Sequence, residues 1–183
     1  MPGQAPSQID PSSLGDYLEV MTKAVFQSGI SWRVIEAKWD GFREAFDGFD
    51  AEKVAALTPE DVDRLAEDTR IVRNRRKIQA TVDNAVELIA LDKEHRSFRN
   101  WLRSHGSFDE TVADLKRHFG FLGETGSYYF LYVVGEKVPP HDEWRASLVF
   151  DLLECERAKM RRETGAQDRT LSHSTFPIQE RQL

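Results

Sequence analysis

The stretch FQSGISW, residues 26–32, is the most informative part of the chain because it ends one predicted helix and starts the next. Gly29 permits the left-handed backbone that commonly follows a helix C-terminus, and Ser31 is a residue type that caps a following helix. This turn places an apolar residue, Ile30, at its tip, with the Trp32 indole directly behind it. Such a pair could wedge a stack of bases and receive a flipped base, but the same two residues could also pack into a helical core.

Helical signals recur along the rest of the chain. The segment TPED, residues 58–61, offers a capping hydroxyl, a proline at the first helical position and acids in the first turn, and SFDE, residues 107–110, is a capping box. Two apolar stripes at helical spacing predict buried faces. The first comprises Ile78, Val82, Ala85, Val86 and Ile89, and the second comprises Trp144, Leu148, Leu152 and Cys155. Without a convincing strand pattern, the sequence predicts an all-α fold of many short helices.

Length and composition set the broad class. A chain of 183 residues favours one domain with a real core, and its net charge of −6 argues against a protein that coats DNA electrostatically. The lone Cys155 excludes an internal disulfide and any multi-cysteine metal site. No apolar run reaches the length of a membrane span and no signal peptide begins the chain, so we expect a cytoplasmic protein.

Polar composition marks both ends of the chain. Residues 1–11 are rich in Pro, Gln, Ser and Gly, and residues 164–183 are polar without a sustained period. We therefore expect a flexible N-terminal lead over 1–11, a helical domain over 12–163, and a mobile C-terminal tail over 164–183.

Two glycines before an apolar helix in FLGETGSYYF, residues 121–130, predict a helical hairpin. Such a turn points several backbone N–H groups at one spot beside the positive end of the following helix, which is a phosphate site that needs no basic side chain. Glu124 would repel phosphate unless it points away, and the alternative is a glycine-bearing turn without a ligand. The candidate contacts to DNA are Gly123, Thr125, Gly126 and Ser127.

The densest run of positive charge lies in residues 70–77. Its candidate contacts to DNA phosphates are Arg75, Arg76 and Lys77, which would supply affinity and salt dependence but no choice of sequence. The run could equally be a solvated helix start that balances the nearby acids in residues 61–68.

Three segments together resemble the DNA-3-methyladenine glycosylase I family: QSGISW at 27–32, the stretch from FREAFDGFD to TVDNA at 42–85, and HFGFLGETGSYYFLYVVG at 118–135. The resemblance implies a multi-helix fold of the helix-hairpin-helix DNA glycosylase superfamily. It also implies a monofunctional DNA N-glycosylase that hydrolyses the bond to a flipped, damaged base in double-stranded DNA. The expected base is an alkylated purine such as 3-methyladenine, and we expect a monomer without a cofactor.

The chain departs from the family pattern at several positions. In the family, a glutamate on the helix before this turn reads the methylated base, and the matching residue here is Ala24. The zinc-binding cysteines and histidines of both family termini have no counterparts, so we predict no metal site. Gln27, Trp32 and Tyr128 are the residues expected to line the base pocket. Tyr129 and Tyr132 could also line it, although helical spacing requires one or two of the three tyrosines to lie in the core. Trp39 and Trp101 are expected in the core.

A carboxylate on the sugar side could stabilise the charge that develops during base release. In the wider superfamily an aspartate just past the hairpin, at the start of the next helix, has this role, and VPPHDEW at residues 138–144 makes Asp142 the matching candidate. Asp142 could instead be only a helix N-cap. Because residues 127–132 contain no lysine, simple hydrolysis is expected rather than lyase chemistry.

Two other functions stay open from the sequence. Loss of a base-reading carboxylate at Ala24 would fit a glycosylase-like module that binds distorted or damaged DNA without catalysis. The ancestral DNA surface could also serve a different partner.

Overall fold

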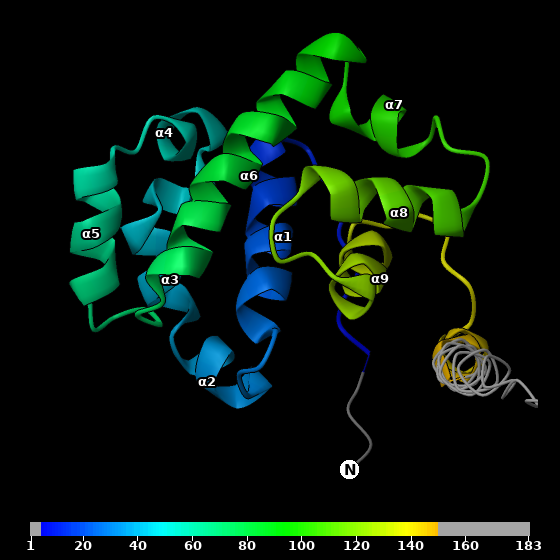
Figure 1. Ribbon diagram of the computed structural model, residues 1–183, viewed down its shortest axis with the longest axis horizontal. Coiled ribbons are helices and arrows are strands. Elements are labelled where there is room, and N and C mark those ends of the chain that lie inside the picture. Colours follow the sequence, from blue (N-terminus) through cyan, green and yellow to red (C-terminus); the bar gives the residue numbers. More distant parts are fainter. Residues whose placement is uncertain (1–4, 150–183) are drawn as a thin grey trace, which may run out of the picture. The chain divides into compact units, whose positions relative to one another are not determined.

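The computed structural model describes residues 5–149, and every regular element in that range is helical, as predicted (Figure 1). The chain divides into two compact units, Met1–Val138 and Pro139–Leu183. Residues 141–149 of the second unit are helical, while Leu152, Cys155 and the predicted tail lie outside the described residues. The elements of the first unit are α1 Leu14–Gln27, α2 Trp32–Ala37, α3 Trp39–Ala45, the 3-10 helix η1 Asp47–Phe49, α4 Ala51–Ala55, α5 Pro59–Glu67, α6 Arg75–Glu94, α7 Phe98–Leu102, α8 Phe108–His118 and α9 Glu124–Val133.

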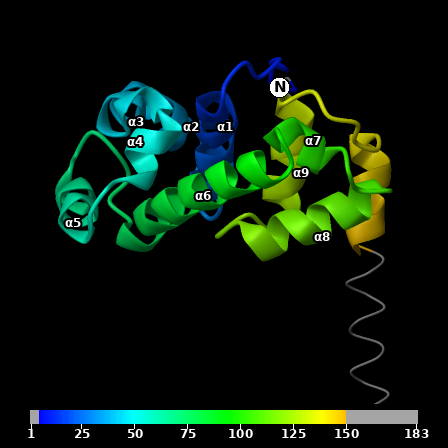
Figure 2. The same ribbon diagram turned by 90° about the horizontal axis from the view of Figure 1, so that it is seen from above.

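The long helix α6 is the centre of the first unit. It crosses the unit with α4 and α5 near one end and α7 near the other, and α1 packs along it (Figures 1 and 2). α9 packs against both α1 and α8. These contacts between helices fix the positions of the end of α1, the end of α9 and the start of α6 relative to one another.

The stripe predicted on α6 is wrong at Val86. Ile78, Val82 and Ala85 are buried, but Val86 is 51 % exposed. Each residue turns a helix by about 100°, so Val86 lies past one edge of the stripe. Leu88, on the other side, is buried instead. The core therefore wraps further around α6 on the Leu88 side than the apolar spacing indicates.

Aromatic rings fill the space between α1, α3 and η1. Trp39 stacks on Phe42 and Phe49 with ring centroids 5.1 and 5.6 Å apart, and Phe26 meets Phe42 edge-on at 4.7 Å. Trp101 is buried in α7. The predicted core positions of Trp39 and Trp101 are confirmed.

The predicted helix caps are present with one change. Thr58 and Asp61 form a reciprocal capping box at the start of α5. At α8 the Ser107 hydroxyl accepts from the Glu110 N–H, as predicted, but the Glu110 carboxylate accepts from the Gly106 N–H at 2.8 Å. The second half of that box is thus displaced by one residue.

Residues 8–11 make contacts with α7 and the end of α9. The Ile9 N–H donates to the Val133 carbonyl at 2.8 Å, and Asp10 pairs with Arg99 at 2.5 Å. The flexible lead and the domain limits inferred from composition stay predictions.

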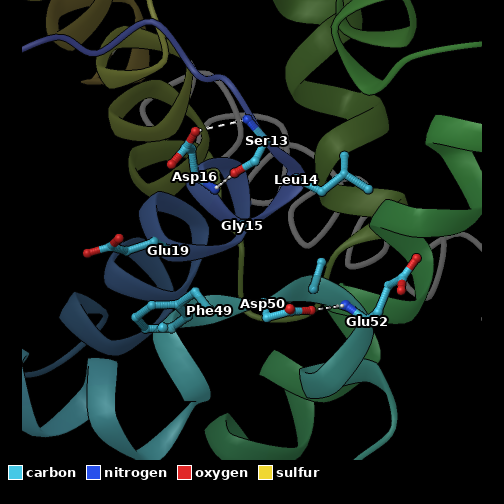
Figure 3. Close-up of a pocket in the computed structure, with 10 residues that line it drawn as sticks. Ser13, Leu14, Gly15, Asp16, Glu19, Phe49, Asp50 and Glu52 are labelled. Atoms are coloured by element: carbon cyan, nitrogen blue, oxygen red, sulfur yellow. Dashed lines mark hydrogen bonds between the residues drawn. The ribbon is translucent and has the colours of Figure 1, made fainter.

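A surface depression lies where the start of α1 meets η1 and α4 (Figure 3). Two of its acidic side chains, Asp16 and Asp50, serve as helix caps. The Asp16 carboxylate accepts from the Ser13 N–H at 2.9 Å, and Asp50 accepts from the Glu52 N–H at 3.1 Å. Because this depression lies at the opposite end of α1 from Gln27, we assign it to the fold.

Gly15, in the first turn of α1, is required by close packing. A Cβ at this position would lie 2.8 Å from the backbone oxygen of Phe49, which cannot rotate away. We expect Gly15→Ala to lower the free energy of unfolding by about 1–2 kcal/mol, because overpacking outweighs the gain in helix propensity. Urea denaturation followed by circular dichroism measures the change. The control is Gly123→Ala, where a Cβ meets nothing within 4 Å; equal stability of both variants would contradict the packing argument.

Candidate functional site

The connection between α1 and α2 is the predicted tight turn. α1 ends at Gln27 and α2 begins at Trp32, with Gly29 at φ +79°. Ser31 occupies the N-cap position, but its side chain makes no capping hydrogen bond. Ile30 is partly buried against the core rather than bare, and its N–H donates to the Gln27 carbonyl at 3.2 Å. The turn is therefore folded back onto the end of α1.

A buried lysine holds this turn in place. Lys77 is 5 % exposed, and its Nζ donates to the carbonyls of Phe26 at 3.3 Å and Ser28 at 2.5 Å. Burial lowers the pKa of the Lys77 ammonium. The side chain satisfies carbonyls that the end of α1 leaves free. We therefore remove Lys77 from the candidate DNA contacts.

Three side chains gather beside the turn: Gln27, Trp32 and Tyr129. The rings of Trp32 and Tyr129 meet edge to face, with centroids 6.1 Å apart, and Trp32 is 44 % exposed. Burial raises the pKa of Tyr129 to about 12, with a smaller opposing effect from the Gln27 side chain, so the hydroxyl stays protonated. Gln27 Nε2 is buried and lies near the Tyr129 hydroxyl, whose pKa it lowers slightly, but it makes no hydrogen bond of normal length and direction with any residue in 5–149. The cluster thus lacks one acceptor, which is a costly arrangement for a buried amide.

Tyr129, and not Tyr128, is the tyrosine that meets Trp32. Tyr128 is buried, and its ring packs on Phe108 of α8 at 6.0 Å. The two tyrosines differ by about 100° around α9, and the sequence does not show which of them faces α2. The expected place of Tyr128 in the base pocket therefore passes to Tyr129.

Two charged residues flank this cluster. Lys23 lies four residues before Gln27 on α1, and Glu36 lies four residues after Trp32 on α2, so each shares a helix face with a cluster residue. Lys23 Nζ is 2.5 Å from Glu36 Oε1 and 5.0 Å from the Trp32 ring centroid. The Glu36 carboxylate also contributes to the raised pKa of Tyr129. Sequence reasoning missed both charges, and only their helical spacing from Gln27 and Trp32 could have indicated them.

α8 and α9 form a helical hairpin whose turn is tied to α6. Asn84 Nδ2 donates to the Gly120 carbonyl at 3.2 Å, and Asn84 Oδ1 accepts from the Gly120 N–H at 2.7 Å. Gly123 and Thr125 are exposed at the start of α9. Since a Cβ on Gly123 would meet nothing within 4 Å, the fold itself does not require glycine there.

Gly126 and Ser127, the other two candidate DNA contacts of the hairpin, lie on the side of α9 that faces the protein interior. A Cβ on Gly126 would lie 3.3 Å from Leu122 Cδ1 and at ordinary contact distance, 3.7 Å, from the Ala24 Cβ, so Gly126 lies against α1. Ser127 is fully buried, and its N–H donates to the Gly123 carbonyl at 2.8 Å. We therefore keep Gly126 only as a backbone contact and remove Ser127 from the candidate DNA contacts.

A groove runs between the first turns of α6 and the α8–α9 turn. The Arg76 guanidinium lies 5.7 Å from the ring centroid of Phe121, which is 42 % exposed and has a left-handed φ of +59°. Such strain in a non-glycine residue often marks a functional position, and the sequence did not reveal it. Arg75 instead pairs with Asp63 at 2.6 Å, as the charge-balance interpretation predicts. The groove is lined by Arg75, Arg76, Gln79, Ala80, Asp83, Asn84, His118, Gly120 and Phe121.

The carboxylate of Glu124 is paired within the hairpin. Lys116 Nζ on α8 lies 2.5 Å from Glu124 Oε1. The positive charge offsets the repulsion that this carboxylate would exert on a phosphate at the start of α9.

Asp142 belongs to the second compact unit. It is the second residue of the helix over 141–149 rather than its cap, since the Trp144 N–H donates to the Pro140 carbonyl at 3.0 Å. Its carboxylate is fully exposed and lies 3.7 Å from His141 Nδ1. The catalytic role of Asp142 stays a prediction.

Within residues 5–149, no three His, Cys, Asp or Glu side chains gather in a way that could hold a metal ion. The predicted absence of a zinc site in the chain stays a prediction. Over the same range, none of the helices is both long and apolar enough to cross a membrane.

Comparison with known proteins decides the family. A family model described as Methyladenine glycosylase matches residues 14–118. The chain belongs to this family. It is 32 % identical over 130 residues to the DNA-3-methyladenine glycosylase of Haemophilus influenzae, covering 60 % of this chain and 70 % of that one. It is 31 % identical, with the same coverage, to DNA-3-methyladenine glycosylase 1 of Escherichia coli.

Solved structures agree with membership of the methyladenine glycosylase family. A crystal structure of 3-methyladenine DNA glycosylase I has a TM-score of 0.60 and 29 % identity, covering 69 % of this chain and 81 % of that chain. A variant of 3-methyladenine DNA glycosylase I in complex with 3-methyladenine has a TM-score of 0.62 and 26 % identity, covering 73 % of this chain and 86 % of that chain. The family match includes the turn at 28–31 and ends at His118, just before the hairpin turn.

Replacing Lys77 should lower the free energy of unfolding, because this side chain is part of the folded core and not of the surface. Lys77→Met leaves the carbonyls of Phe26 and Ser28 without their donor, and we expect a loss of about 1–3 kcal/mol in the free energy of unfolding. The matched control is Arg76→Met at the adjacent exposed position, which should change stability by less than about 0.5 kcal/mol. Urea denaturation compares the two variants. Similar losses at both positions would show that Lys77 has no special role at the end of α1.

Proposed function

We propose that this chain is a DNA glycosylase that flips an alkylated purine such as 3-methyladenine out of double-stranded DNA and hydrolyses its N-glycosidic bond. The protein would act as a single copy without a metal or other cofactor. Its membership of the methyladenine glycosylase family and the activities named for its relatives support this assignment. The observation that carries it is the unpaired Gln27 amide beside Trp32.

The Gln27 cluster has the chemistry of a base site. A purine offers a flat π surface for stacking on an indole and ring nitrogens that accept hydrogen bonds from an amide. Trp32 supplies the indole, and Gln27 Nε2 supplies a buried donor that no described protein atom satisfies. Occupation by a flipped base would remove the cost of that unsatisfied donor. Ile30, next to Trp32 in the turn, would fill or wedge the space that the base leaves.

DNA would lie across the turn at 28–31, the start of α6 and the start of α9. Lys77 joins the first two of these segments, and Asn84 joins the hairpin turn to α6. Arg76 and Phe121 supply a cation and an exposed ring in the groove. Backbone N–H groups at Gly123, Thr125 and Gly126 would meet a phosphate at the helix N-terminus.

Asp142 is the carboxylate that we propose for the sugar. Its assignment rests on its position after the hairpin, at the start of a helix, and on the need for negative charge near an oxocarbenium-like transition state. A lesion that is already cationic is a good leaving group, so this carboxylate would need little help from a separate acid.

The activity is tested with duplexes that carry methylated or deaminated bases, with abasic sites scored by alkaline cleavage. We expect base release by the wild-type protein and a loss of at least about 100-fold in Asp142→Asn, the size typical of a lost catalytic group. Equal release by both proteins would exclude Asp142 from the chemistry. No release from any lesion, together with tight binding to abasic-site DNA, would favour the non-catalytic binding module instead.

The hairpin contact is tested by Gly123→Ala. Its Cβ would stand in open space in the free protein but would separate a phosphate from the backbone N–H groups. We expect roughly tenfold weaker binding to abasic-site duplex, equivalent to about 1.4 kcal/mol. Because Gly123 is the N-cap of α9 and Ala is a poorer N-cap, the free energy of unfolding should fall by no more than about 1 kcal/mol, so the protein stays folded. Fluorescence anisotropy measures the affinity. Binding at wild-type strength would place the DNA elsewhere.

The turn is tested by the double variant Ile30→Ala with Trp32→Ala. Removing the indole should cost about 1–3 kcal/mol of lesion binding, because stacking of the flipped base is lost. Intact duplex does not present a flipped base, so its affinity should fall much less. A parallel fall for both duplexes would contradict the wedge and base-site assignments.

A further inference from the structure

The Lys23–Glu36 ion pair lies beside the proposed base site but has no part in the proposed function so far. Lys23 Nζ lies between two indoles, 5.0 Å from the Trp32 centroid and 4.9 Å from the Trp39 centroid. Both distances are within the range of cation–π attraction. Trp39 is itself fixed, since its Nε1 donates to Glu19 Oε1 at 2.8 Å. The ammonium is thus held in a defined place at the face of the Trp32 ring.

The two charges of this pair are unequally exposed. The Lys23 side chain is 18 % exposed, whereas the Glu36 side chain is 41 % exposed. The carboxylate is therefore the more accessible of the two charges to a ligand that comes from solvent. Tyr129, the other titratable group of the cluster, is uncharged at neutral pH because its pKa is about 12.

We propose that the Lys23–Glu36 pair determines the charge preference of the base site. Glu36 attracts a purine that carries a positive charge, and Lys23 limits that attraction so that neutral bases are not excluded. This proposal rests on the proposed function, because it requires the base to stack at Trp32. The ligand class is a cationic, ring-alkylated purine, whose positive charge is delocalised over the ring that would lie on the indole.

Neutralising one or the other member of the pair should change the binding of a cationic purine in opposite directions. Glu36→Gln removes the outer negative charge and leaves an uncompensated ammonium, so a cation is repelled. Lys23→Gln leaves an uncompensated carboxylate beside the indole, so a cation is attracted more strongly. A merely structural ion pair would behave differently. Either substitution would break the same contact and would therefore weaken the binding of both cationic and neutral ligands.

The experiment measures binding of a matched pair of purines to the full chain by calorimetry. The compounds are 3,9-dimethyladeninium, which is permanently cationic, and 9-methyladenine, which is neutral. We expect Glu36→Gln to weaken binding of the cationic purine by about tenfold and Lys23→Gln to strengthen it by about threefold or more. Changes of this size are expected from the loss of one charge that solvent partly screens. Binding of the neutral purine should stay within about twofold in both variants.

Lys23→Arg is the matched control, because it keeps the charge, the ion pair and the stacking on indole. It should bind both compounds like the wild type, and thermal unfolding should verify that every variant is folded. If both neutralising variants weaken binding of the cationic purine to the same extent, or change the affinity for both purines together, the pair does not determine the charge preference. The base site at Trp32 would remain in that case. If the wild type binds neither compound, the base site at Trp32 fails, and this proposal fails with it.

Discussion

The ammonium of Lys77 lies on the carbonyls of Phe26 and Ser28, and the geometry of the site follows from that contact. Because the lysine belongs to α6, the central helix, the end of α1 is fixed to the centre of the unit. Gln27 and the turn at 28–31 are placed by the same contact. α2 has only Ile35 buried and no side-chain cap, so its position depends on this turn and on side-chain contacts such as Lys23 with Glu36.

The charges around the site explain how an acidic chain could bind DNA. Arg75 and Lys116 are each neutralised by a carboxylate, at Asp63 and Glu124. Arg76 has no carboxylate within ion-pair distance in residues 5–149 and lies over Phe121 instead. Affinity would therefore come from a few contacts, backbone N–H groups and an inserted ring rather than from a broad basic surface. Such binding depends less on salt than a lysine-rich interface does.

Much of the fold could be predicted from the sequence because helix signals are local. The Thr58 cap, the left-handed Gly29 and most of the α6 stripe depend on residues within one or two turns. Apart from the caps at Ser31 and Glu110, the failures are matters of which side a residue faces in three dimensions. Val86 was expected inside and Lys77 outside, and Tyr128 was preferred over Tyr129, because helical spacing gives a stripe but not the width of the surrounding core. The Lys23–Glu36 pair and the strained Phe121 depend on contacts between helices, which no local pattern records.

In the proposed complex the buried Gln27 amide donates a hydrogen bond to a base stacked at Trp32. Nitrogen-15 NMR during titration with 3-methyladenine tests it directly, through the side-chain amide of Gln27 and the indole N–H of Trp32. We expect both resonances to shift together, to saturate with one dissociation constant and to lie among the largest changes in the spectrum. Saturable shifts elsewhere in the protein, with these two resonances unmoved, would contradict it.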